Sequence, residues 1–313
     1  MTLKKKISII TPTFNEKDNL DELIQRLQAV ISNMPTYDFE ILIIDNCSTD
    51  GTKEKLREIA TTHPTMKIIF NTRNFGHIRS PYYGILQTTG DATIYLASDL
   101  QDPPEMIPQF IQEWESGYKL VMAVKPSSEG NKIVHTVRKL YYKFLDSISD
   151  VAIIKDSTGF GLYDKSVINY LKQINDPYPF LRGLICELGF KVKTITFDQP
   201  RRIRGLSKNN IYTLYDIAML GIVSHSMVPI RVFSFLGFII GLLSLLSAGI
   251  YTVMKLTMWD QYPMGSAPIL IGMFFLGGVQ LIFIGILGEY LGSIHSYVKN
   301  RPIVVEEQRL HHE

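Results

Sequence analysis

The stretch Asp91–Glu105, DATIYLASDLQDPPE, contains a short apolar strand that ends abruptly in a polar loop. Thr93–Ala97 is an apolar, β-favouring run of the kind that forms a buried strand. Asp99, Gln101 and Asp102 follow it, and a Pro-Pro-Glu run then favours the first turn of a helix. In open α/β sheets ligands bind at the carboxyl ends of strands, so this loop is a candidate site for a hard divalent cation and phosphate. A polar loop with an Asp helix cap is the alternative explanation.

Strands and helices alternate along the first 125 residues. Strands are expected over Ile7–Thr13, Phe39–Ile44, Met66–Phe70, Thr93–Ala97 and Lys119–Val124. Helices are expected over Leu20–Met34, Lys53–Thr62, a segment ending near Thr88, and Pro104–Ser116. This alternation predicts an α/β fold with right-handed crossovers and a mostly parallel, Rossmann-like sheet. The loops after the first, second and fourth strands then meet at one edge, which brings Glu16, Asp45 and Asp99 to one cleft.

The rest of the globular part is expected from Ser157–Tyr163, a turn at Phe180–Gly183, and Lys191–Phe197. The chain has 313 residues and a net charge of +2, so charge does not require a nucleic-acid partner, and we expect none. Its two cysteines, Cys47 and Cys186, provide neither metal-ligand spacing nor a disulfide framework.

Two C-terminal stretches are long and apolar. Val232–Met254 has 23 residues without a charge and Met264–Gly288 has 25, and about 20 are needed to cross the hydrocarbon core. The connection Lys255–Pro263 carries one Lys and one Asp, whereas the flanking segments are rich in Arg and Lys. The positive-inside rule therefore predicts a two-helix transmembrane hairpin with the large domain and both termini in the cytoplasm. A buried pair of core helices is the alternative.

Three further segments carry basic or apolar patterns. The loop 201–208, RRIRGLSK, suits a phosphate-rich ligand, although a solvated run of charge is also compatible with it. Ile211–Met227 has the pattern of an interfacial helix that leads into a bilayer. Lys132–Ile148 is amphipathic and basic, which fits either a membrane surface or a core-packed helix with a solvated basic face.

Five motifs occur in the order seen in family 2 glycosyltransferases. They are Pro12–Glu16 (PTFNE), Asp45–Thr52 (DNCSTDGT), Arg73–Gly76 (RNFG), Asp99–Glu105 (DLQDPPE) and Arg202–Lys208 (RIRGLSK). The ending Gly277–Gly292, followed by Arg301-Pro302, resembles the polyprenyl-phosphate glycosyltransferase branch, which includes dolichol-phosphate mannosyltransferase and the bactoprenol glucosyltransferases. This resemblance covers nearly the whole chain. It implies a GT-A fold and an inverting transfer of a sugar from a nucleotide diphosphate to a lipid phosphate.

The resemblance also implies which residues hold the donor. The nucleoside would be held by Pro12, Phe14, Glu16, Asp45 and Asn46. The resemblance also implies that Ser98, next to Asp99, belongs to this donor site.

The diphosphate would be held by a cation and by basic side chains. The resemblance implies that Asp99 and Gln101 hold Mg²⁺ or Mn²⁺ on the diphosphate. Arg202 and Lys208 would bind phosphate groups of the donor or acceptor, and with Asp99 they would form the catalytic set. Because the acceptor phosphate is already ionised at pH 7, the reaction needs no strong general base.

The resemblance further implies the organisation and partners of the chain. We expect a glycosyltransferase domain over 1–208, an interfacial helix over 209–230, a hairpin over 231–293 (spans near 232–254 and 264–288), and a cytoplasmic tail over 294–313. The expected partners are a nucleotide sugar, UDP-linked as in bacterial relatives, a polyprenyl phosphate acceptor, and the lipid of a bacterial inner membrane. Small residues in the second span favour a homo-oligomer, for example a tetramer.

Several positions depart from the family's pattern. Ala97 and Asn46 replace acids, and the family's Asp-Phe-Arg segment is replaced by Gly159-Phe160-Gly161. His77 stands where the family often has a Lys or Arg, and Asn209 replaces an aromatic residue. Two interpretations follow. The chain belongs to a subfamily that uses a different sugar and has fewer protein ligands at its metal site, or it is a catalytically weak relative that serves as the membrane partner of a flippase or polymerase. A processive polysaccharide synthase is disfavoured because no Arg-Trp pair occurs.

Overall fold

Eight strands form one sheet in the part of the chain that the computed structural model describes, which comprises residues 4–125, 154, 157–174, 176–200, 228–257, 266–299 and 301–311. The strands are β1 (Lys6–Thr13), β2 (Asp38–Asp45), β3 (Met66–Asn71), β4 (Ala92–Tyr95), β5 (Leu120–Val124), β6 (Ser157–Asp164), β7 (Val192–Thr196) and β8 (Glu306–Leu310). Their spatial order is β7-β5-β6-β4-β1-β2-β3-β8.

The sheet is mixed, with a parallel centre and antiparallel flanks. β4, β1, β2 and β3 are parallel neighbours, and β5 is parallel to β7. β6 runs antiparallel to both β4 and β5, and β8 runs antiparallel to β3. The expectation of an α/β fold is confirmed, but the parallel pairing is limited to these two groups of strands. The polar loops after β1, β2 and β4 lie at one edge, as the alternation predicts.

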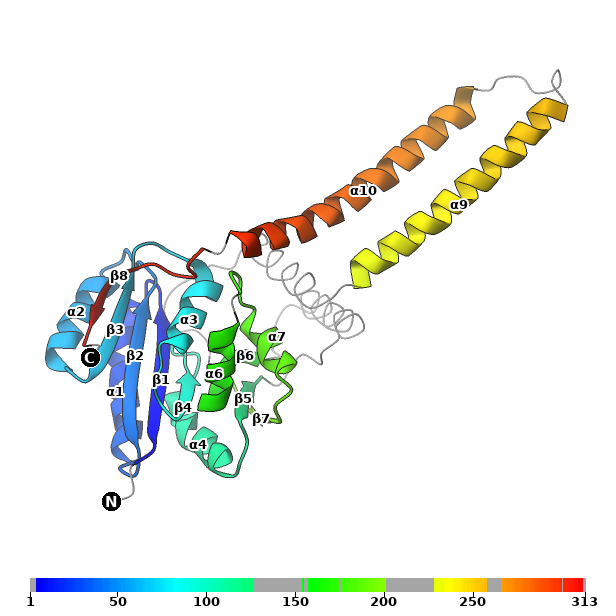
Figure 1. Ribbon diagram of the computed structural model, residues 1–313. Helices are drawn as coiled ribbons and strands as arrows, with labels where there is room; N and C mark the ends of the chain where they lie inside the picture. Colours follow the sequence, from blue (N-terminus) through cyan, green and yellow to red (C-terminus); the bar gives the residue numbers. More distant parts are fainter. Residues whose placement is uncertain are drawn as a thin grey trace.

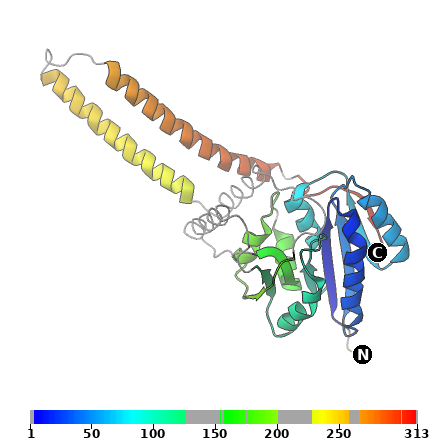
Figure 2. The same ribbon diagram turned by 180° about the vertical axis from the view of Figure 1, so that it is seen from behind.

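Helices cover both faces of the sheet (Figures 1 and 2). One face carries α1 (Leu20–Ser32), α2 (Thr52–Thr62) and α4 (Ile107–Glu115), and the other carries α3 (Gly76–Leu86), α6 (Lys165–Gln173) and α7 (Leu181–Glu187). Short 3-10 helices, η1 (Lys17–Asn19) and η2 (Pro104–Met106), precede α1 and α4. The side-chain alternation of a strand explains the two cores, because Ile9 packs on one face and Ile10 on the other, both with 0% exposure.

A close approach fixes α3 over the centre of the sheet. A Cβ added at Gly84 would lie 2.6 Å from Ile10 Cδ1 and 3.0 Å from Ile44 Cγ2, so a larger residue would require these core side chains on β1 and β2 to shift. The helix begins at Gly76, next to the loops at the carboxyl ends of those strands. The packing of Gly84 therefore directs the N-terminus of α3 toward the edge where the predicted site lies.

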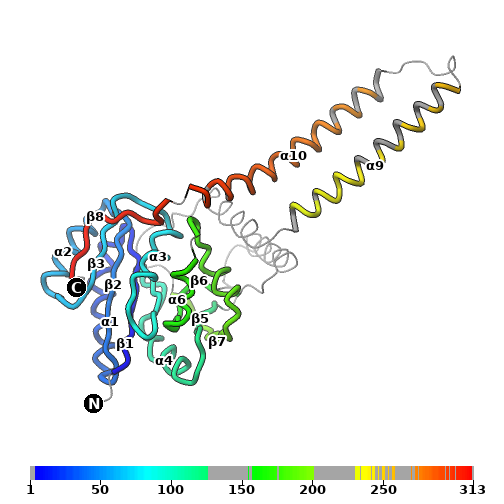
Figure 3. Tube along the Cα trace, viewed as in Figure 1, coloured from blue at the N-terminus to red at the C-terminus, as the bar shows by residue number. Residues whose placement is uncertain are grey.

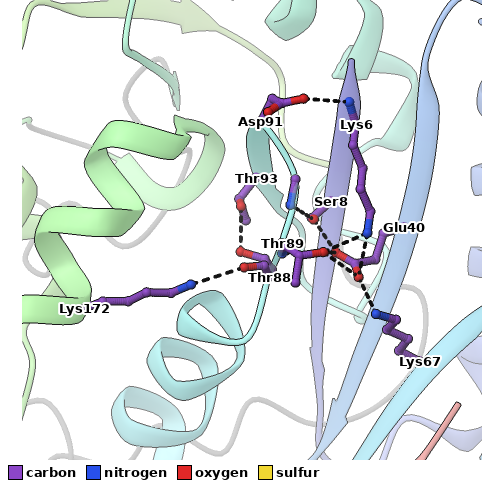
Figure 4. A network of polar contacts seen from close by, with 10 residues as sticks. Lys6, Ser8, Glu40, Lys67, Thr88, Thr89, Asp91, Thr93 and Lys172 are labelled. Atoms are coloured by element: carbon purple, nitrogen blue, oxygen red, sulfur yellow. Dashed lines mark hydrogen bonds and ion pairs between the residues drawn. The ribbon is translucent and has the colours of Figure 1, made fainter. Parts of the chain in front are cut away.

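A buried carboxylate ties together the opposite, amino edge of the sheet (Figure 4). Glu40 of β2 is 4% exposed and forms ion pairs with Lys67 (2.8 Å) and Lys6 (3.3 Å). Its oxygens also accept hydrogen bonds from the Ser8 hydroxyl and from the backbone N–H of Thr89 (3.2 Å). Burial alone would raise the pKa of Glu40, but the hydrogen bonds from Lys67, Ser8 and Thr89 outweigh it and lower the pKa to about 2.

The C-terminal segment rejoins the sheet rather than forming a separate tail. β8 pairs with β3, and the N–H of Thr72 donates to the Val305 carbonyl at 3.0 Å. The Tyr83 hydroxyl donates to Glu306 at 2.8 Å, and Lys53 pairs with Glu307. The expected tail over 294–313 therefore contains the edge strand of the domain. The short, charged run EEQRL lacks the apolar alternation that would have revealed it.

Two long helices leave the domain together and project from the end of the sheet opposite the N-terminus (Figures 1 and 3). They are α9 (Val228–Thr257) and α10 (Ser266–Val298), and they approach one another where a Cβ at Gly237 would lie 3.7 Å from Phe283. In the described part of the chain, the window Phe275–Gly292 is the one segment long and apolar enough to cross a membrane, and 6% of it is buried. The predicted span 264–288 overlaps this window, whereas the span 232–254 stays a prediction.

Candidate active site

A cleft of about 320 Å³ opens at the carboxyl ends of β1, β2 and β4. Four strand-to-helix loops contribute to its walls, because parallel strands deliver their carboxyl ends to the same edge. The predicted site residues that line it are Pro12, Phe14, Glu16, Asn46, Ser98 and Asp99. Asp45 and Gln101 are not among its lining residues, and Arg202 and Lys208 lie outside the described residues.

Asp99 stands on the wall of this cleft in a sharply bent loop. Its Oδ1 accepts a hydrogen bond from the N–H of Gln101 at 3.2 Å, and Leu100 between them has a φ of 60°. A leucine in the left-handed region is strained, and such strain is typical of functional loops. The Gln101 side chain donates from Nε2 to the Pro200 carbonyl at 3.5 Å. The structure thus places Asp99 on the wall of the cleft, whereas Gln101 is not among its lining residues.

Two buried groups hold the Asp99 loop from beneath. The Ser98 hydroxyl donates to the Pro12 carbonyl at 3.0 Å, which joins the loop after β4 to the end of β1. Asp102 is 3% exposed and accepts a hydrogen bond from the N–H of Ala97 at 3.1 Å. Burial raises the pKa of Asp102 to about 7. Ser98 therefore lines the cleft with a hydroxyl that is already engaged, and Asp102 supports the loop on which Asp99 sits.

Asp45 organises the loop after β2 and does not line the cleft. It is 0% exposed, and its carboxylate accepts hydrogen bonds from the backbone N–H of Ser48 (3.1 Å) and from the Ser48 hydroxyl. Burial raises its pKa, and the two bonds from Ser48 oppose that shift. Cys47, between them, has a φ of 63°. The predicted contact of Asp45 with a nucleoside stays a prediction.

Asn46 is an asparagine for a structural reason. Its Nδ2 donates to Asn74 Oδ1 (2.9 Å) and to the Gly76 carbonyl (3.2 Å). Its Oδ1 accepts from Asn71 Nδ2 (3.1 Å) and from the N–H of Phe75 (2.9 Å). A carboxylate could not make the two donations. This departure from the family's acid therefore joins the end of β2 to the turn that begins α3.

The last residue of β1 and the loop after it contribute an unpaired hydroxyl and several contacts. Asn15 has a φ of 56° and is fixed by Ser48, whose hydroxyl accepts its N–H at 2.8 Å. Glu16 is 8% exposed and accepts a hydrogen bond from Asn19. Thr13 lines the cleft and is 2% exposed, and its hydroxyl has no hydrogen-bond partner among the described residues. An unsatisfied buried polar group of this kind is consistent with a site completed by a ligand.

A second, smaller cavity continues the cleft and contains an arginine that the motifs did not indicate. Its walls share His77, Pro81 and Tyr95 with the cleft, and Arg182 of α7 and Gly159 of β6 extend it. Arg182 Nη1 donates to the Ser157 carbonyl at 3.1 Å. No local pattern in the sequence predicts this position, because α7 reaches the site only through the fold.

Gly161 explains part of the missing Asp-Phe-Arg segment. A Cβ at this position would lie 2.2 Å from the Val121 carbonyl oxygen, because β6 passes very close to β5 there. Its φ of 159° lies at the limit of the region that favours glycine. An arginine side chain, as in the family's pattern, does not fit on this backbone. The close pairing of β6 with β5 therefore requires glycine at position 161.

The donor set fits a divalent cation that takes most of its ligands from a substrate. Asp99 provides a carboxylate on the cleft wall, and no group of three or more His, Cys, Asp or Glu side chains that could hold a metal occurs within the described ranges. Mg²⁺ and similar hard cations are commonly held by one or two carboxylates together with substrate phosphates. The cleft thus suits a metal carried in with a diphosphate better than an all-protein metal site.

Comparison with known proteins places the chain in a family. The model of the family described as glycosyl transferase family 2 matches residues 8–171. The uncharacterized glycosyltransferase sll0501 of Synechocystis sp. is 35% identical over 299 residues, which cover 95% of this chain and 93% of that protein. The SfII prophage-derived bactoprenol glucosyl transferase of Shigella flexneri is 31% identical over 298 residues, covering 95% and 96%.

A solved structure gives a looser likeness. A mannosyltransferase from Pyrobaculum calidifontis, in complex with GDP-Man and Mn²⁺, is 13% identical, with a TM-score of 0.48 over 96% of this chain and 89% of that one. A score at this level is too low to assign a ligand here. The family match and the relatives above 30% identity decide the question: the chain belongs to glycosyl transferase family 2, is a glycosyltransferase, and has bactoprenol glucosyl transferases among its relatives.

Proposed function

We propose that this glycosyltransferase moves a hexose-type sugar from a nucleotide diphosphate sugar, UDP-linked by preference, to a polyprenyl phosphate at the inner membrane of a bacterium. Relatives named bactoprenol glucosyl transferase match it over nearly their full length, which supports a lipid-linked acceptor. The product would serve the modification of a cell-surface glycan.

One observation carries the proposal: the carboxylate of Asp99 lines a cleft at the end of the sheet from which α9 and α10 project. A water-soluble donor and a membrane-embedded acceptor can meet only at the membrane surface. A donor cleft at the base of two apolar helices satisfies that requirement. The exposed side chains of α10, such as Leu281 (71%) and Ile284 (63%), would then face lipid.

The proposed anchor is the two-helix hairpin, with spans near 232–254 and 264–288 and the enzyme domain on the cytoplasmic side. The charge asymmetry of the flanking segments supports this orientation. The domain limits that we propose are 1–208, 209–230 and 231–293, to which the strand β8 adds a returning segment. Small residues of α10 would provide contacts for a homo-oligomer.

The donor would be held by residues around the cleft. Pro12, Phe14, Glu16 and Asn46 line the part of the cleft nearest β1 and β2, where we place the nucleoside, with Asp45 below them. Ser98 and Asp99 line the part formed by the loop after β4, where we place the diphosphate. The N-terminus of α3 at Gly76 also opens on the cleft and favours a negatively charged group.

Asp99 would hold Mg²⁺ or Mn²⁺ on the diphosphate. Gln101 would be a second ligand of the cation after its side chain rotates away from Pro200. When bound, this cation supplies Lewis-acid stabilisation of the charge that develops on the leaving nucleoside diphosphate. We place Arg202 and Lys208 with the phosphate groups, and Arg182 at the far end of the continuous cavity as a further cation. These side chains bind and align two anions.

The nucleophile in this proposal is a phosphate oxygen of the acceptor, which attacks the anomeric carbon as the bond to the diphosphate breaks. It is already ionised, so the protein does not have to remove a proton. Catalysis then depends on holding the two reactants in line, which an inverting transfer requires. The absence of an acid at Gly159 is compatible with such a mechanism.

The alternative of an inactive membrane partner is not favoured. Asn46 and Gly161 depart from the family for packing and hydrogen-bonding reasons that leave the cleft open. The decisive experiment incubates the full-length protein in detergent with radiolabelled nucleotide sugars, a polyprenyl phosphate and Mg²⁺. We expect a chloroform-soluble labelled product that disappears with EDTA and returns with Mg²⁺ or Mn²⁺. If none of the nucleotide sugars tested gave a labelled lipid, the proposal would be contradicted.

A further inference from the structure

A second pocket, separate from the donor cleft, lies where the cytoplasmic end of α10 meets the turn between β3 and α3. Its volume is about 400 Å³, within the range of ordinary ligand sites. Its basic lining residues come from two distant parts of the chain: Arg73, Arg79, His295, Lys299 and Arg301. No carboxylate belongs to this lining.

Two arginines, Arg73 in the β3–α3 turn and Arg79 in the first turns of α3, are oriented without acidic partners among the described residues. The Arg73 guanidinium lies 4.0 Å from the centre of the Phe75 ring and donates to the Asn74 carbonyl at 3.2 Å. The Arg79 guanidinium lies 4.2 Å from the Tyr178 ring, and its Nε donates to the Pro177 carbonyl at 2.8 Å. These cation–π contacts and hydrogen bonds position both guanidinium groups and leave other N–H groups available for an anion.

The basic side chains of the pocket are not held in ion pairs. Within the described residues, none of the five forms an ion pair. Asp176 precedes the lining residue Pro177, and its carboxylate, which keeps its charge, accepts hydrogen bonds from the N–H of Tyr178 (2.8 Å) and from the Tyr297 hydroxyl. The lining itself contains basic side chains and no carboxylate, so the pocket favours the binding of an external anion.

The pocket lies along α10 at the headgroup layer of a bilayer and just beyond it. The apolar window ends at Gly292, and a helix rises 1.5 Å per residue. His295 therefore lies roughly 5 Å and Lys299 roughly 10 Å beyond the window. The polar layer on each side of the hydrocarbon core is roughly 5–8 Å thick, so His295 lies within it and Lys299 just outside it, where its long side chain can extend back to a headgroup. Arg73 and Arg79 line the same pocket as these two residues of the C-terminal end of the helix.

We propose that this pocket binds the phosphate group of an anionic phospholipid in the cytoplasmic leaflet, an inference that rests on the membrane placement proposed above. Arginine forks and a lysine point charge are the groups that bind phosphate oxygens. The lipid is a structural ligand and not the sugar acceptor, because the β3–α3 turn separates this pocket from the donor cleft.

The same turn gives the lipid a route to influence the donor site. Asn74 and Gly76 line the donor cleft, whereas Arg73 and Phe75 line the lipid pocket. A phosphate held by Arg73 restrains a turn whose other residues shape the cleft. Membrane anchoring and donor binding are thereby coupled through four consecutive residues.

The test measures lipid retention by native mass spectrometry of the full-length protein in detergent, with phosphatidylglycerol and phosphatidylcholine as probes. The double variant Lys299→Gln, Arg301→Gln is compared with a charge-matched control, Lys4→Gln, Lys191→Gln, at exposed positions outside the pocket. We expect the pocket variant to bind phosphatidylglycerol about 10-fold or more weakly, with phosphatidylcholine unaffected and the control like wild type. Lipid retention does not depend on sugar transfer, so it can fail while the proposed reaction stands.

Three outcomes would overturn the proposal. Equal phosphatidylglycerol retention by both double variants would exclude the pocket. Full competition by inorganic phosphate at low millimolar concentration would indicate a site for free phosphate. Retention of a polyprenyl phosphate in preference to phosphatidylglycerol would assign the pocket to the acceptor. If the pocket variant unfolds in detergent, Arg73→Gln, on the other wall, replaces it with the same expectations.

Discussion

The two edges of the central sheet are built in opposite ways. At the amino edge, Glu40 is buried with two lysines and two hydrogen-bond donors around it, so its charge is satisfied. At the carboxyl edge, the loops after β1, β2 and β4 each contain a residue in the left-handed region: Asn15, Cys47 and Leu100. The same parallel strands thus end in a closed polar network on one side and in strained, open loops on the other.

The two edges contribute to the stability of the fold in opposite ways, because the amino edge stabilises it and the carboxyl edge destabilises it. A non-glycine residue in the left-handed region costs roughly 1–2 kcal/mol, and the unpaired hydroxyl of Thr13 at the same edge adds to that cost. Such costs persist only where the surrounding structure enforces them, and they gather at functional loops. The comparison predicts that substitutions at the carboxyl edge reduce activity, whereas those at the amino edge reduce stability.

The largest effect is expected from Asp99→Asn. Loss of the carboxylate removes the proposed metal ligand, and sugar transfer to polyprenyl phosphate should fall by at least about 100-fold. The melting temperature should stay near that of wild type, because among the described residues Asp99 forms one hydrogen bond, to the N–H of Gln101 in its own loop. Asp38→Asn, an exposed acid at the amino end of β2, is the matched control and should leave transfer unchanged. Unchanged turnover in the Asp99→Asn variant would show that this carboxylate is not a required metal ligand.

An intermediate effect is expected from Asn46→Asp. The new carboxylate would face Asn74 Oδ1 and the Gly76 carbonyl without a proton to donate, which should cost about 2 kcal/mol of stability. Because those partners line the cleft, the KM for the nucleotide sugar should rise as well. Thermal denaturation and donor titration measure the two effects. Asn169→Asp, at an exposed position in the middle of α6, should change stability by less than about 0.5 kcal/mol. A stable Asn46→Asp variant with an unchanged KM would show that the amide is dispensable.

The smallest effect on sugar transfer is expected from Glu40→Gln, whose effect on stability depends on pH. Neutralising the side chain removes two ion pairs and should lower stability at pH 7 by roughly 2–3 kcal/mol, with transfer preserved. The pKa of Glu40 is lowered in the folded protein, so its contribution is present above the ordinary value of 4.5 and is lost as pH falls toward about 2. The difference in melting temperature between wild type and variant should therefore shrink over that interval. A difference that is constant down to pH 2 would contradict the lowered pKa.

Much of the fold follows from local sequence patterns. The strands over Ile7–Thr13 and Phe39–Ile44 were predicted within one residue at each end, because continuous apolar runs between polar loops leave few alternatives. β4 ends two residues earlier than expected, at Tyr95, where the chain turns toward the cleft. The helix expected from Pro104 begins with a 3-10 turn and becomes α-helical at Ile107. The reversed direction of β6 depends on non-local pairing, which no local pattern encodes.

The site was predictable in composition but not in detail. The alternation of strands and helices predicted that Glu16, Asp45 and Asp99 share a cleft, and the structure places Glu16 and Asp99 on its walls. The sequence could not indicate that Asp45 turns inward to Ser48, or that Gln101 turns toward Pro200, because a hydrogen bond within the folded loops decides each rotamer. Arg182 was missed because its helix reaches the cavity only after the chain has crossed the sheet.

The return of β8 to the sheet makes the helical pair an insertion within a domain rather than an appendage after it. β3 acquires its second neighbour only from residues that follow α10 in the chain. During synthesis the sheet would therefore carry an open edge until the hairpin has been made and has left the ribosome. A fragment cut before α9 would keep that edge unpaired, and an unpaired edge invites association with other chains. Completion of the catalytic domain is in this way linked to delivery of its anchor.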